Sequence, residues 1–252
     1  MKKYFILLWL LLPLPVVVVH FGRGQQWLAR DKAHAFIVQA QSMEKQEKWQ
    51  EADRCYREAA KCVGTGEPDV KMRLDLAQVR TRYRQGDAVA AMDMMDKVVN
   101  DTAFPAMPVE FRRESRELSG RIHYYAGWVM RLEGARRELW MEEAELARQN
   151  FRLLTEQSAA ENTTDAKDYS RGQQMNLESA VRLQRMSLYE LMAKPLPEEG
   201  KNMGGQGLSE QMSKRRGERG KGKQPGEGEG EGEGQKPSPG AGTQRFTPGE
   251  GS

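Results

Sequence analysis

The stretch from Gln25 to Lys194 carries no strand signal, and this constrains the fold more than any other feature of the chain. No segment in it alternates apolar and polar residues with a period of two. The strong helix formers Ala, Leu, Met, Glu, Gln, Arg and Lys dominate it instead. The sequence therefore predicts an all-α protein.

Helix-breaking and capping residues divide this stretch into segments. Pro68 follows a glycine-rich break and suits the first turn of a helix, Gly86-Asp87 suits a tight turn, and Asn162 to Asp165 are good N-cap residues. The predicted helices cover residues 25–46, 49–63, 68–84, 87–100, 108–133, 135–159 and 165–193.

The helix predicted at 108–133 has the cleanest amphipathic pattern. Apolar and small residues recur along it at alternating steps of four and three, from Phe111 to Leu132. The next helix repeats the pattern from Trp140 to Ser158. The two stripes predict a long antiparallel hairpin within residues 105–195, with the last helix covering its open end.

The N-terminus is strongly apolar. Lys2 and Lys3 precede residues 4–21, which contain no Asp, Glu, Lys or Arg and are long enough for a minimal membrane span. No cleavage site of small residues follows, so we interpret residues 1–24 as a transmembrane anchor, with a cleaved signal segment as the alternative. The short basic N-terminus favours retention in the cytoplasm, which places the body on the non-cytoplasmic side of the inner membrane.

Residues 196–252 differ from the body in composition. From Gly200 onward the chain has 16 of its 25 glycines and few large apolar residues, so we expect this tail to be disordered. A basic block precedes glutamates that alternate with glycine, and it could act as an electrostatic contact site or as a solubilising spacer. Its basic side chains are Lys214, Arg215, Arg216, Arg219, Lys221 and Lys223.

Packing residues within 25–104 recur in two successive predicted helix pairs. The first pair has large and small residues at spacings of three and four, and the second pair repeats three of them after Gly86-Asp87. These positions are Phe36, Ala40, Trp49, Ala52, Tyr56, Ala59, Ala91, Met95 and Val98. The pattern resembles the tetratricopeptide repeat, in which alanines let two helices approach and an aromatic residue fills the gap one turn later. The resemblance implies stacked antiparallel hairpins in a short solenoid with a concave face for protein partners.

The order of segments along the chain also resembles that of a known group of proteins. An N-terminal apolar segment, helix pairs and a hydrophilic tail together resemble the repeat proteins of bacterial aerotolerance-type operons. Those proteins are thought to work with membrane von Willebrand A-domain proteins and MoxR-type ATPases. The resemblance implies a protein partner within a membrane complex.

Residues suited to catalysis or metal binding are scattered. The three histidines form no ligand spacing with Cys, Asp or Glu, and no phosphate-binding glycine loop precedes Gly200. Cys55 and Cys62 lie about 10 Å apart if they share a helix, too far for a disulfide. We therefore expect no cofactor, no metal and no enzymatic activity.

Two aromatic residues, Tyr124 and Trp128, lie off the main apolar stripe of their helix and are candidate partner contacts. The function we expect is a non-enzymatic membrane-anchored scaffold that docks a partner protein. One alternative is a structural envelope or secretion component that forms a homo-oligomer through the hairpin at 108–159. The other is polyanion binding through the basic block, although a net charge of +3 and the lack of interleaved aromatics argue against a nucleic-acid partner.

Overall fold

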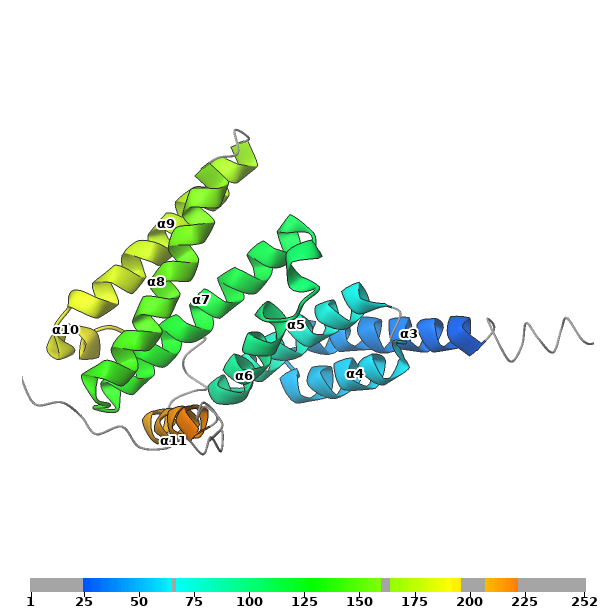
Figure 1. The fold of residues 1–252 in the computed structure, drawn as a ribbon, viewed down its shortest axis with the longest axis horizontal. Coiled ribbons are helices and arrows are strands. Elements are labelled where there is room, and N and C mark those ends of the chain that lie inside the picture. Colours follow the sequence, from blue (N-terminus) through cyan, green and yellow to red (C-terminus); the bar gives the residue numbers. More distant parts are fainter. Residues whose placement is uncertain (1–24, 65–66, 160–163, 196–206, 222–252) are drawn as a thin grey trace, which may run out of the picture.

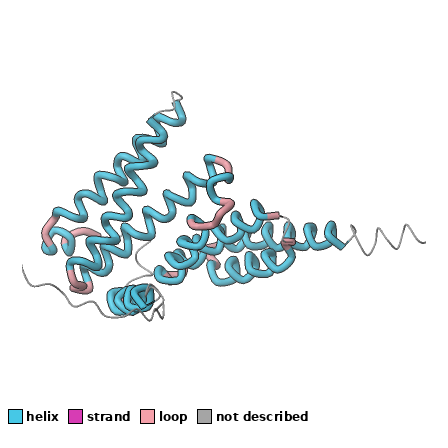
Figure 2. The backbone as a smooth tube through the Cα atoms, in the orientation of Figure 1, coloured by secondary structure: helices cyan, strands magenta, loops and turns pink. Residues whose placement is uncertain are grey.

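The computed structural model describes residues 25–64, 67–159, 164–195 and 207–221, and within these ranges it contains helices and loops but no strand. Figure 2 shows these helices in cyan and the loops between them in pink. The predicted all-α class is confirmed. The helices are α3 (Gln25–Lys45), α4 (Trp49–Cys62), α5 (Pro68–Arg84), α6 (Ala88–Val99), the short 3-10 helix η2 (Phe104–Ala106), α7 (Val109–Leu132), α8 (Arg137–Ala159), α9 (Thr164–Arg185), α10 (Leu188–Met192) and α11 (Leu208–Lys221).

Successive helices pack in pairs. α3 packs on α4, α5 on α6 and α7 on α8, and α9 lies along the other side of α8. Figure 1 shows the pairs following one another from α3 at one end of the molecule to α9 and α10 at the other. The molecule is therefore elongated, and each pair mainly contacts its neighbours.

Local signals set most of the helix ends. Pro68 occupies the first turn of α5, and Asp87 caps α6 by accepting a hydrogen bond from the backbone N–H of Ala90 at 3.1 Å. Gly134 separates α7 from α8 with a φ of 74°, a left-handed conformation that glycine adopts without strain. These ends lie within a few residues of the predicted ones.

One large apolar core joins the middle of the molecule. It runs from Met72 and Leu76 on α5 through α6 to Phe111 on α7 and Trp140 on α8. Phe104 and Met107 belong to the same core, so the expected boundary between residues 104 and 105 falls inside continuous packing. A smaller cluster fills the space between α3, α4 and α5, and two others lie between α7, α8 and α9.

The prediction of one continuous helix over residues 165–193 is wrong, because the chain forms two helices there. α9 ends at Arg185, and Ser187 then starts α10 with a capping box: its side chain accepts from the N–H of Glu190 while the Glu190 carboxylate accepts from the N–H of Ser187. The extended backbone of Ser187 breaks the helix between them.

The expectation of disorder throughout 196–252 is wrong for residues 208–221, which form α11 and pack on α6, α7 and α8. Leu208 and Met212 are buried in the large core. The side chain of Glu133 accepts hydrogen bonds from the backbone N–H groups of Leu208 and Ser209 at 3.1 and 2.7 Å, which caps the start of the helix. The apolar surface that orders this segment comes from helices far away in the sequence.

The predicted membrane segment at residues 4–21 lies outside the described residues. Among the helices that the structure does describe, none combines the length and the apolar character that crossing a bilayer requires.

Candidate binding groove

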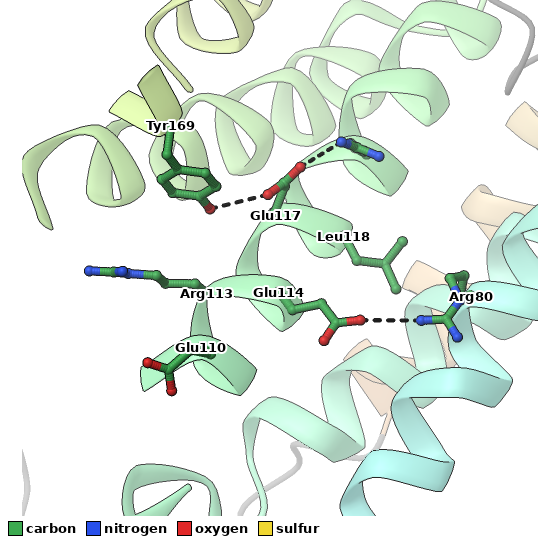
Figure 3. A pocket seen from close by; sticks show the side chains of 8 residues that line it. Arg80, Glu110, Arg113, Glu114, Glu117, Leu118 and Tyr169 are labelled. Atoms are coloured by element: carbon green, nitrogen blue, oxygen red, sulfur yellow. Dashed lines mark hydrogen bonds and ion pairs between the residues drawn. The ribbon is translucent and has the colours of Figure 1, made fainter. Parts of the chain in front are cut away.

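A hollow of about 390 Å³ lies where α5, α7 and α9 come together. Figure 3 shows its side chains, most of which come from one face of α7. It is lined by Arg80 of α5, by Glu110, Arg113, Glu114, Glu117, Leu118 and Arg121 of α7, and by Tyr169 of α9.

The sequence of α7 accounts for this arrangement. The lining residues of α7 recur every three or four positions, so they form one stripe of the helix, while Phe111, Ser115 and Ile122 form the buried stripe beside it. α7 thus packs one face into the core and presents a charged face to the hollow.

Arg80 holds one end of the hollow. Its guanidinium contacts the carboxylate of Glu44 on α3 at 3.1 Å and that of Glu114 on α7 at 3.2 Å. Burial acts to lower the pKa of Arg80, but the Glu44 carboxylate and its hydrogen bonds outweigh burial, so the pKa lies above its ordinary value. Arg80 therefore stays charged and ties three helices together.

Glu117 holds the other end. It accepts a hydrogen bond from the hydroxyl of Tyr169 at 3.1 Å and another from Arg121 at 2.5 Å. Figure 3 shows the Tyr169 side chain reaching toward Glu117. Burial, followed by the negative charge of Glu117, raises the pKa of Tyr169, so the phenol remains a hydrogen-bond donor at neutral pH.

A second hollow of about 330 Å³ continues from the first toward α3. The two share Arg80 and Glu114, and the second is also lined by Ile37 of α3, Leu74 of α5 and Phe111 of α7. Together they form one groove across α3, α5, α7 and α9, which we call the helix groove. Its lining mixes fixed charges with apolar surface, which suits binding of a polypeptide segment.

Tyr56 and Arg73 also line the second hollow. Burial, with the charge of Glu44, raises the pKa of Tyr56 to about 12, so this phenol stays neutral. The guanidinium of Arg73 lies 5.7 Å from the ring centre of Phe111, a cation–π distance.

The described lining of the groove contains no histidine, cysteine, serine or threonine. Within the described ranges, no three His, Cys, Asp or Glu side chains are placed to hold a metal ion. His123 and Glu143 pair across α7 and α8 with 2.5 Å between Nδ1 and Oε2, away from the groove lining. Cys55 and Cys62 both lie on α4 as free thiols.

The residues expected to pack the repeats lie mainly in two places. Ala40, Ala52, Tyr56 and Ala59 are buried between α3, α4 and α5, with Phe36 packed against them. Ala91, Met95 and Val98 are buried where α6 meets its neighbours in the large core. Trp49 is half-buried under Arg84, whose guanidinium lies 5.6 Å from its ring centre.

The expectation that Trp128 is free to contact a partner is wrong. Its exposed fraction is 5%, because Leu183 and Leu191 of α9 and α10 cover it. Tyr124 packs beside it with a ring-centre distance of 5.8 Å, and burial raises the pKa of Tyr124 to about 12. These aromatic residues hold α7 against α9 and α10.

The basic block of the tail makes contacts within the chain. Arg215, with 10% of its side chain exposed, pairs with Asp93 at 2.6 Å and Asp96 at 2.9 Å. Arg216 pairs with Glu142, and Lys214 pairs with Glu210 at 2.7 Å. The side chains of Arg219, Lys221 and Lys223 lie outside the described residues. Arg215, expected to face an external partner, instead fixes α11 to α6.

The charged lining of the helix groove was not predicted from the sequence. Arg80 and Glu44 are 36 residues apart, and Tyr169 and Glu117 are 52 apart, so only the packing of helices brings them together. The sequence contains one signal for this surface, which is the charged stripe of α7 that runs beside its apolar stripe.

Comparison with protein-family models, with curated proteins and with solved structures found no match for this chain.

Proposed function

We propose that this chain is a non-enzymatic scaffold whose helix pairs stack in a tetratricopeptide-like manner and hold a segment of a partner protein in the helix groove. The observation that carries the proposal is the groove itself. It crosses α3, α5 and α7, the first helices of three successive pairs, and is lined by charged side chains that rigid helices hold in place. Repeat proteins bind partners on such extended concave faces.

The apolar residues 4–21 support the second half of the proposal, which is that the scaffold is anchored in a membrane. The body would then lie on the non-cytoplasmic side, and its partner would be a component of a membrane complex. A membrane ATPase or a von Willebrand A-domain protein fits the resemblance in segment order described above.

The test is a pull-down of the full chain from native membranes, read by mass spectrometry. Glu110→Arg reverses an exposed charge of the groove lining, and Glu138→Arg is its matched control. Both residues are exposed in the first turn of a long helix, so both substitutions remove the same favourable charge from a helix N-terminus.

We expect Glu110→Arg to reduce recovery of a specific partner about fivefold, the effect of losing roughly 1 kcal/mol at a charged rim, while Glu138→Arg leaves recovery unchanged. Equal recovery with both variants would refute docking in the groove. Recovery of this chain alone, with a stable oligomer by sedimentation at micromolar concentration, would favour the structural alternative.

A further inference from the structure

α10 presents three apolar side chains to solvent at the end of the molecule. The exposed fractions are 45% for Leu188, 85% for Tyr189 and 68% for Met192, whereas Leu191 on the inner side is fully buried. Large apolar side chains grouped in this way on a surface mark interaction sites more often than single ones do. We call Leu188, Tyr189 and Met192 the α10 patch.

Positively charged side chains lie next to Tyr189 of the α10 patch. Arg182, Arg185 and Lys194 are exposed, and none of them forms an ion pair with any described residue. They line, with Tyr189, a hollow of about 650 Å³. Glu190 also lines it; its carboxylate accepts a hydrogen bond from the backbone N–H of Ser187 at 2.6 Å and keeps a negative charge that Lys194 attracts. The face therefore combines the apolar α10 patch with an adjoining hollow of net positive charge.

The α10 patch is rigidly supported. Arg131 of α7 donates hydrogen bonds to the backbone carbonyls of Leu183 and Met186 at the end of α9, and its guanidinium lies 4.3 Å from the ring centre of Trp140. The capping box of Ser187 then fixes the start of α10. A surface that is already ordered loses little entropy when it binds.

We propose that the α10 patch docks an acidic amphipathic segment of a partner protein. The apolar side chains of that segment would cover Tyr189 and Met192, and its carboxylates would pair with Arg182, Arg185 and Lys194. Charge complementarity favours an acidic partner, because the hollow is lined by three cations and one carboxylate, that of Glu190. This site is distinct from the helix groove, with which it shares no lining residue.

A lipid surface fits the same face less well. Figure 1 shows α10 and the start of α3 at opposite ends of the molecule, and the apolar residues 4–21 precede α3. A hollow also suits projecting side chains of a polypeptide better than a flat headgroup layer does.

The experiment uses the full chain in nanodiscs of zwitterionic lipid and fluorescein-labelled peptides of about 14 residues, read by anisotropy. Each peptide carries Leu or Phe at helical spacing among Asp and Glu, and a matched set carries Lys in place of the acidic residues. Tyr189→Ala and Arg185→Glu test the patch. Lys167→Glu, at an exposed position near the other end of α9, is the control for charge reversal.

We expect an acidic peptide to bind at least tenfold more tightly than its basic counterpart, with affinity that falls as salt is added. Tyr189→Ala and Arg185→Glu should each weaken binding about tenfold, and Lys167→Glu should not. Tyr189 is so exposed that its removal leaves the fold intact, which an unchanged circular dichroism spectrum would verify.

Three results would overturn the proposal. The first is that none of the acidic peptides binds, or that acidic and basic peptides bind equally. The second is that vesicles of anionic lipid bind in a way that Tyr189→Ala abolishes, which would make the patch a lipid site. The third is self-association that Tyr189→Ala removes, which would make the occupant a second copy of this chain.

Discussion

The backbones of α7 and α8 approach closely at Gly127. A Cβ atom added there would lie 3.1 Å from the carbonyl oxygen of Trp140 and 3.2 Å from the backbone nitrogen of Ala144. Both contacts are shorter than ordinary van der Waals distances, and both are to backbone atoms of a buried helix face, which cannot rotate away as a side chain could. Gly127→Ala should therefore force the two helices apart.

The size of the effect follows from two opposing terms. Alanine improves helix propensity by about 1 kcal/mol over glycine. Inserting a methyl group into a well-packed contact costs about 1–3 kcal/mol. The free energy of unfolding should thus fall by up to about 2 kcal/mol in Gly127→Ala. Gly172 on α9 supplies the control, since nothing lies within 4 Å of its added Cβ. Gly172→Ala should raise stability by about 0.5–1 kcal/mol.

Urea unfolding of the full chain in a mild nonionic detergent, followed by circular dichroism, measures both variants. The midpoint should move down for Gly127→Ala and up for Gly172→Ala, with the slope unchanged. An upward shift in Gly127→Ala equal to that of Gly172→Ala would show that α7 and α8 do not cross as closely as described.

Three further predictions concern charged side chains. Arg215→Ala removes two charge-assisted hydrogen bonds that hold α11, so the amides of that helix should exchange hydrogen about tenfold faster, while Lys214→Ala should have little effect. Hydrogen bonds from Arg148 lower the pKa of Glu145 to about 2. The ionised Glu145 carboxylate therefore contributes to stability above pH 4.5, and this contribution is lost as the pH falls through about 2. Arg148→Ala should raise the pKa of Glu145, measured by NMR titration. Asp87→Ala removes the N-cap of α6 and should lower the free energy of unfolding by about 1 kcal/mol, measured by urea.

The helix ends could be predicted because the signals for them are local. Pro68, Asp87 and Gly134 act through their own backbone or through an N–H a few residues away. The break between α9 and α10 was missed although its signal is also local: Ser187 and Glu190 stand three residues apart, the spacing of a capping box.

α11 and the helix groove could not be predicted in the same way. The composition of the tail suggests disorder, and Leu208 and Met212 are too few to form a core by themselves. They become buried because α6, α7 and α8 provide a prepared apolar surface. The contacts of Arg80 and Tyr169 likewise depend on helices that are distant in sequence, so no local pattern identifies them.

The docking of α11 makes the apolar core of the middle helices depend on a segment that lies more than 70 residues further along the chain than Glu133, whose carboxylate caps it. A substitution that releases α11 would therefore expose Leu208 and Met212 together with the apolar surface of α6, α7 and α8 that they cover.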